Sequence, residues 1–259
     1  MNDNSLVTDA ASKVAQVTLA FWVMKICATT LGETAGDLIS MTLNLGYALS
    51  SLILIGLFAV SLALQLMASR FHAPLYWLVI LTTSTAGTTI SDYMDRTLGL
   101  GYATGSVILL GCLLTTLAVW RLSEHTLSVS EISSRRSESF YWIAILFSNT
   151  LGTAVGDLLA DDSGLGFLGG ASLIGALIAA VALASYLTRI NRALLFWIAF
   201  ILTRPFGATL GDFLTKPQDK GGLDFGTVGS SAILATVLVL MVGHTTWKAR
   251  APASNAARG

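Results

Sequence analysis

Long apolar segments separated by short polar stretches fill most of this chain of 259 residues. Each segment has about 20 apolar-dominated residues, the length that an α-helix needs to cross a bilayer. Uninterrupted apolar runs such as 52–64 and 174–184 lack the alternation typical of a transmembrane β-strand. The pattern therefore predicts an all-α, polytopic membrane protein with eight transmembrane helices.

A shared register divides the chain into four tandem units. Trp22, Trp77, Trp142 and Trp197 recur at intervals of 55, 65 and 55 residues, and a motif close to Gly-x-x-x-Gly-Asp keeps the same intervals. Two equal intervals around a longer one predict two pseudo-symmetric halves of two units each, residues 1–121 and 140–247. The Ser- and Glu-rich stretch 122–139 is predicted to be a cytoplasmic linker, and residues 248–259 a disordered tail.

Each unit is expected to form a helical hairpin. Its first helix runs from an aromatic start to just beyond the aspartate of the motif, and a short Gly-containing turn follows. The second helices are expected to begin near residues 46, 101, 166 and 225 and to end near residues 67, 120, 186 and 247. The four tryptophans at the starts of the first helices are interpreted as interfacial anchors.

Basic residues are distributed unequally between the two sets of loops. One side of the predicted membrane carries most of them, whereas the other has only Arg96, Lys216 and Lys220. The positive-inside rule then places both termini in the cytoplasm. Because every unit enters from the same side, the four repeats are parallel and should be related by an axis along the membrane normal.

Overall composition supports a membrane protein and excludes other classes. Charged residues make up 12% of the chain, about half the share that is usual in soluble domains. The net charge of zero gives no indication of a nucleic-acid partner. The sequence contains no nucleotide-binding motif, so ATP-driven pumping is not expected.

Acidic residues at the ends of the first helices are the main functional signal. Placing an aspartate within a membrane costs about 3 kcal/mol on insertion scales. Asp157 lies 15 residues after Trp142, about 22 Å along a helix, and so in the outer third of the membrane. If the first helices surround one axis, these acids converge and can bind a hard divalent cation. The expected metal ligands are Asp37, Asp92, Asp157, Asp212 and Glu33.

Polar residues at four-residue steps before the aspartates extend this stripe toward the middle of the membrane. Those expected to contribute neutral oxygens or to line a substrate path are Thr88, Thr153, Asn149, Thr29 and Ser84. Lys25 and Arg204 are expected to compensate acidic charge when no cation is bound. With only these two bases at depth, three of the five negative charges remain for protons or a cation to neutralise.

Small residues four apart allow close approach of helices in lipid. The glycines expected to pack helices in this way are Gly32, Gly36, Gly87, Gly152, Gly156, Gly207 and Gly211. In the second unit Ser91 replaces the second glycine of the motif.

These features favour a secondary transporter of a hard divalent cation, with manganese as the candidate ion and protons as the exchanged species. The other partners are the lipid bilayer and, as an open question, further copies of the chain. Two alternatives stay open: a non-transporting sensor or scaffold, in which the aspartates only cap turns, and a pathway for organic cations or protons. An enzyme is not expected, since no nucleophile–base pair or metal-hydrolase spacing is present.

Four tandem two-helix repeats with an early Trp and a Gly-x-x-x-Gly-Asp end resemble a family of bacterial integral membrane proteins catalogued as a repeat of unknown function. The resemblance covers residues 18 to 247 and implies an inner-membrane location without an activity. The stretch from Gly32 to Asp37 is also similar to the Glu-x-Gly-Asp motifs of manganese and calcium cation/proton exchangers. Here Glu33 stands four residues before Asp37 rather than three.

Overall fold

The computed structural model describes residues 14–129, 132 and 134–250. Over these residues the protein is all-helical, as predicted, with eight long helices. They are α2 (Leu19–Asp37), α3 (Gly46–Met67), α4 (Ala73–Asp92), α5 (Tyr102–Glu124), α6 (Arg135–Asp157), α7 (Gly166–Leu187), α8 (Arg192–Thr215) and α9 (Thr227–Arg250). The predicted tail at 248–259 falls mostly outside the described residues.

Local sequence explains where the helices begin. The Thr18 and Ser134 hydroxyls accept backbone hydrogen bonds in the first turns of α2 and α6, and the Asn191 side chain does the same for α8. Pro74 occupies the first turn of α4, where a missing N–H costs nothing. A glycine with positive φ lies at or next to the start of each of α3, α5, α7 and α9.

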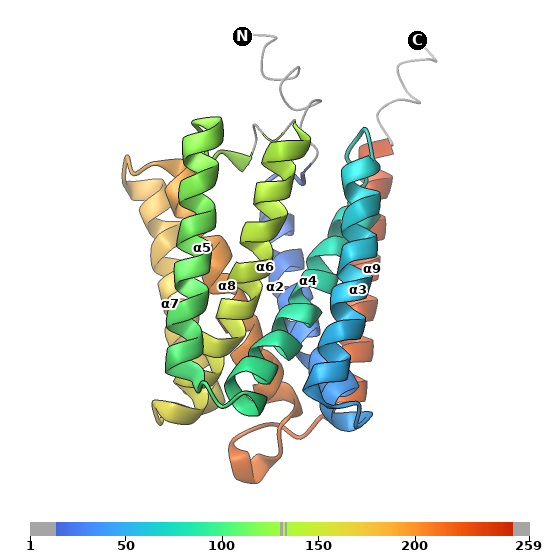
Figure 1. Cartoon of the computed structure of the whole chain (residues 1–259), viewed down its shortest axis with the longest axis vertical. Coiled ribbons are helices and arrows are strands. Elements are labelled where there is room, and N and C mark those ends of the chain that lie inside the picture. Colours follow the sequence, from blue (N-terminus) through green and yellow to red (C-terminus); the bar gives the residue numbers. More distant parts are fainter. Residues whose placement is uncertain (1–13, 130–131, 133, 251–259) are drawn as a thin grey trace.

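The first helices of the four units, which are α2, α4, α6 and α8, form an inner bundle. Each packs against the next one along the chain, and α8 packs against α2, so the bundle closes into a ring. The remaining helices lie outside this ring, and α2 begins at the end of the molecule where α9 finishes (Figure 1). This arrangement agrees with four parallel repeats around one axis.

The outer helices do not pack as the predicted hairpins require. Each outer helix packs mainly against the inner helix of the following unit: α3 against α4, α5 against α6, and α7 against α8. The last outer helix, α9, returns to the first inner helix, α2. The turn after each inner helix therefore carries the chain sideways to the neighbouring unit, and every unit depends on another to cover its inner helix.

Six of the eight helices are long and apolar enough to cross a membrane, judged over the described residues. The outer helices expose large apolar side chains, among them Leu52, Val107, Leu183 and Val239. Of the inner helices, α2 and α4 fall short of that criterion. The reason lies in their polar residues, which include Lys25, Glu33 and Asp37 on α2 and a run of threonines and serines on α4.

Aromatic side chains fill the inner bundle at the end where its helices begin. Trp77, Trp142 and Trp197 are buried among helices rather than directed outward, which differs from their expected role as interfacial anchors. The hydroxyls of Tyr76 and Tyr141 lie 2.6 Å apart in the same region. This end of the bundle is therefore packed with aromatic side chains.

The segment between α5 and α6 is shorter than the predicted linker 122–139, because α5 runs to Glu124 and α6 begins at Arg135. It also packs on the protein. Val129 and Ile132 are buried, and the Trp197 indole donates a hydrogen bond of 3.1 Å to the Leu127 carbonyl oxygen.

Candidate functional site

Equivalent residues of the four inner helices form layers stacked along the axis of the bundle, and three of the four layers are rich in polar side chains. Successive layers are four residues apart, about one helical turn. From the aromatic end they contain Lys25, Ile80, Ile145 and Phe200; then Thr29, Ser84, Asn149 and Arg204; then Glu33, Thr88, Thr153 and Ala208; then Asp37, Asp92, Asp157 and Asp212. All sixteen side chains are buried.

The aspartate layer is bridged by two bases that the sequence analysis assigned only to outer loops. The Arg96 guanidinium lies 3.0 Å from an Asp92 oxygen and 3.1 Å from an Asp157 oxygen. The Lys216 ammonium lies 3.1 Å from an Asp212 oxygen and 2.5 Å from an Asp37 oxygen. Each base thus joins its own aspartate to that of the following unit, with the fourth unit joined to the first.

Helical structure continuing past the aspartates brings these bases back to the site. After α4 the chain continues as the π-helical turn η2 (Tyr93–Thr97), which contains Arg96, while Lys216 caps the end of α8. In both cases the base follows its aspartate by four residues, a spacing that places it on the same face. This spacing is the sequence signal that identifies Arg96 and Lys216.

The charge balance of the site changes accordingly. The five buried acids now face four bases, Lys25, Arg204, Arg96 and Lys216, so the formal charge is −1 rather than the expected −3. The negative charge left for a cation to compensate is therefore smaller than the sequence indicated. It lies in the layer of the four aspartates.

Arg204 neutralises Glu33 in the next layer toward the centre. One of its terminal nitrogens, Nη2, donates to Glu33 Oε2 at 2.9 Å and to the hydroxyl oxygens of Thr88 and Thr153 at 2.6 Å each. These two hydroxyls lie 3.3 and 3.5 Å from the Glu33 carboxylate. Glu33, Thr88 and Thr153 are thus brought together around one guanidinium.

Lys25 has no acidic partner among the residues that the structure describes. Its ammonium lies 3.4 Å from the Asn149 side-chain oxygen and 4.1 Å from the centre of the Phe200 ring. Asn149 in turn donates to the Thr83 hydroxyl at 2.8 Å. The Thr29 hydroxyl donates to backbone carbonyls, including that of Thr203. Of the proposed neutral ligands, Thr29, Ser84 and Asn149 thus lie a layer farther from the aspartates than Thr88 and Thr153.

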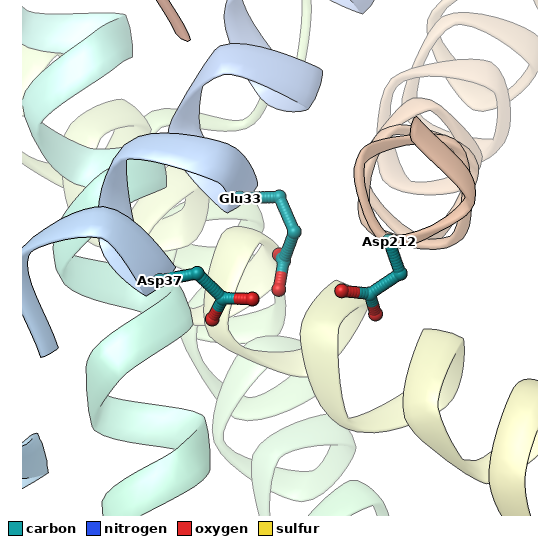
Figure 2. Close-up of side chains that lie close together, drawn as sticks. All are labelled: Glu33, Asp37 and Asp212. Atoms are coloured by element: carbon teal, nitrogen blue, oxygen red, sulfur yellow. The ribbon is translucent and has the colours of Figure 1, made fainter. Parts of the chain in front are cut away.

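Three of the predicted metal ligands converge. Oxygens of Glu33, Asp37 and Asp212 lie within 4.8 Å of one another, and all three side chains are buried. They come from α2 and α8, and their carboxylates turn toward a shared space (Figure 2). Oxygen ligands at 2.3–2.6 Å from Ca²⁺ lie at most about 5 Å apart, so the spacing is compatible with a hard divalent cation of this size. Asp92 and Asp157 lie outside this group.

A family model described as Repeat of Unknown Function (DUF347) matches residues 20–71, 75–126, 140–191 and 195–251. These four matches cover well over half of the chain. The chain belongs to this family. We found no match among curated proteins or among solved structures. Each DUF347 repeat contributes one inner and one outer helix, and consecutive repeats interlock because the outer helix covers the inner helix of the next.

The glycines of the DUF347 motif lie where neighbouring inner helices meet. A Cβ atom on the first glycine of each repeat would collide with the following repeat. The pairs are Gly32 with Ser84, Gly87 with Asn149, Gly152 with Arg204 and Gly207 with Thr29. One turn on, a Cβ on Gly36 would meet Thr88, one on Gly156 would meet Ala208 and one on Gly211 would meet Glu33. Gly207 and Gly211 of the fourth repeat make these contacts with the first repeat and so close the ring.

Proposed function

We propose that this DUF347 protein is a secondary transporter of a hard divalent cation, with manganese as the candidate ion, and that it exchanges the cation for protons. All eight helices are proposed to cross the bacterial inner membrane, with both termini in the cytoplasm. The observation that carries the proposal is the convergence of Glu33, Asp37 and Asp212 inside a bundle whose surface is apolar. Buried carboxylates in a membrane generally mark an ion pathway.

Crossing by α2 and α4 follows from their place in the bundle. Their polar residues face the other inner helices, and the outer helices stand between the ring and the lipid. With 19 and 20 residues, they are long enough for a bilayer of about 30 Å. A polar helix enclosed in this way does not expose its charges to hydrocarbon.

Lys216 gives this site a means of exchange. Its ammonium contacts two of the three converging acids and so offsets one of their two negative charges when no ion is present. A divalent cation that binds these oxygens must displace the ammonium, and its side chain is 19% exposed and can move outward. Protons are the other species able to neutralise the carboxylates, which provides the physical basis for antiport.

A non-transporting membrane protein is the second candidate, and the ion pairs favour it. Each of the four aspartates contacts one of two shared bases, so ion pairs hold the layer together without an added ion. In that case the layer serves to hold the four DUF347 repeats in register. The two candidates differ in whether a cation enters the Glu33–Asp37–Asp212 group.

Flux into liposomes separates these candidates. Purified protein reconstituted in vesicles should carry Mn²⁺ along an opposing proton gradient, and Asp212→Asn should reduce the rate about tenfold or more, a loss of ~1.4 kcal/mol in cation binding. Asp162→Asn is the matched control, because this aspartate is exposed just beyond the corresponding helix of the third repeat. Equal flux in Asp212→Asn and wild type would overturn the proposal, and no Mn²⁺ flux in any variant would favour the non-transporting candidate.

A further inference from the structure

We propose that the middle of the inner bundle holds a second site, for one small anion of halide size, formed by Arg204 and Lys25. This site lies one to two layers from the acidic layers toward the aromatic end and is independent of the proposed cation transport. Two observations support it: positive charge exceeds negative charge in this part of the bundle, and several hydrogen-bond donors around Arg204 have no acceptor among the described residues.

Positive charge exceeds negative charge in this part of the bundle. Lys25 and Arg204 are both fully buried, and Glu33 is the acid nearest to them in the stack. Glu33 is already bound by Arg204, while the contacts of the Lys25 ammonium with described residues are to a neutral amide oxygen and an aromatic ring. A buried base without a counter-ion is unfavourable, and a bound anion removes this cost.

Hydrogen bonding around Arg204 is unevenly distributed among its nitrogens. Nη2 makes all of the side chain's hydrogen bonds, to Glu33, Thr88, Thr153 and the Ser84 carbonyl oxygen. Nε and Nη1 have no partner in the described part of the chain, although the residue is 0% exposed. Buried guanidinium N–H groups ordinarily meet an acceptor, so these donors indicate a ligand with acceptor character.

Neighbouring groups supply further donors and limit the size of the ligand. The Ser84 hydroxyl, in the same layer as Arg204, is buried and also has no hydrogen-bond partner among the described residues. The layer is enclosed by four helices in close contact, since Gly32, Gly152 and Gly207 of this region have no room for a Cβ atom. A single halide ion accepts several hydrogen bonds without directional demands and is smaller than a polyatomic anion, so it is the anion that this closely packed layer favours.

Equilibrium binding of radiolabelled chloride tests the site directly. The full-length protein in lipid nanodiscs, without divalent cations, is titrated with chloride at constant ionic strength, with gluconate as the replacing anion. We expect one saturable site whose affinity falls at least tenfold in Lys25→Met and in Arg204→Met. Arg189→Met is the control, because Arg189 is exposed in the loop before α8 and should leave binding unchanged.

A second measurement places the ion. Crystals grown with bromide should show an anomalous peak beside Arg204 Nε and Nη1. The proposal is overturned if the folded wild-type protein binds no chloride saturably, or if Lys25→Met and Arg204→Met bind as wild type does. If Arg204→Met does not fold, Lys25→Met alone decides. Because chloride binding is measured without Mn²⁺, loss of the anion site and failure of cation transport are separate results.

Discussion

Arg96 and Lys216 occupy equivalent positions in the second and fourth repeats, but their side chains differ in chemistry. Each base lies four residues after an aspartate and bridges to the next repeat, so the two bridges are related by a pseudo-twofold axis. Guanidinium binds carboxylates in a fixed planar fork, whereas ammonium is a compact charge on a flexible chain. Under the proposed function, the lysine bridge, which also has Glu33 beside it, is therefore the one that an incoming cation opens.

Replacing Lys216 with methionine should lower stability and raise cation affinity together. The change leaves Asp37 and Asp212 without their ammonium, and we expect a loss of about 1–3 kcal/mol, below the usual cost for a fully buried pair because Lys216 is partly exposed. Mn²⁺ should restore more stability to this variant than to wild type. Thermal unfolding with and without Mn²⁺ measures both effects, with the exposed Lys220→Met as control. Equal Mn²⁺ stabilisation of variant and wild type would contradict the assignment.

The pair between Arg204 and Glu33 should behave as a coupled unit. Either Glu33→Gln or Arg204→Met leaves a buried charge unmatched, which costs about 3–5 kcal/mol. The double variant should lose less than the two single losses combined, by roughly 0.5–3 kcal/mol. Unfolding in mixed micelles with increasing SDS measures these energies. Strictly additive losses would mean that the 2.9 Å contact contributes no coupling.

At the scale of helices, the repeat register alone predicted most of what the structure describes. The starts of α3 and α7 at Gly46 and Gly166 match the expected positions, because the turn glycine there adopts a positive φ. The common depth of the four aspartates follows from equal spacing to the tryptophans. The pairing of outer with inner helices could not be predicted, since hydrophobic periodicity defines a buried face without identifying the helix that covers it.

The candidate site was likewise predictable in part. The aspartates and the polar stripe followed from four-residue spacing, which any helix imposes. Arg96 and Lys216 were assigned to loops because the first helices were expected to end just beyond the aspartates, and the four-residue spacing of each base is informative only where the helical structure continues. The grouping of Glu33 with Asp37 and Asp212, and not with Asp92 or Asp157, depends on contact between α2 and α8, residues far apart in the chain.

Contact between inner helices predicts opposite effects of the same substitution at two glycines. Gly207→Ala places a methyl group against Thr29 and should cost about 1–3 kcal/mol. Gly111→Ala, on the outer helix α5, meets no neighbouring atom and should be neutral or stabilising by up to ~1 kcal/mol through helix propensity. Thermal unfolding of both purified variants compares them. Similar losses at the two positions would argue against the tight α2–α8 contact.

At the scale of the whole molecule, the ring is closed by contacts between the first and fourth DUF347 repeats. The α9 helix packs against α2, and the hydroxyls of Thr42 and Thr227 lie 2.7 Å apart. The Ser231 hydroxyl meets that of Thr34 at 2.8 Å deeper in the same contact. Ring closure places the last outer helix on the first inner helix rather than leaving either face uncovered.

A disulfide across this seam tests the closure. With Cys27 and Cys112 replaced by alanine, Thr42→Cys with Thr227→Cys should oxidise within one chain. A protease site engineered into the linker between α5 and α6 then gives two fragments that stay joined on a gel until reduced. A control with Thr42→Cys and Gly111→Cys, on the distant helix α5, should not crosslink. Disulfides that form only between chains would show that the ring is open.

Interlocked repeats also constrain how such a protein can arise and be divided. A chain of two DUF347 repeats has one inner helix without an outer helix to cover it, and one outer helix without an inner helix to cover. Two copies of such a half-length chain satisfy one another when they associate. A gene for half of this protein could therefore produce a complete bundle as a homodimer, and fusion of two such genes would produce the present single chain.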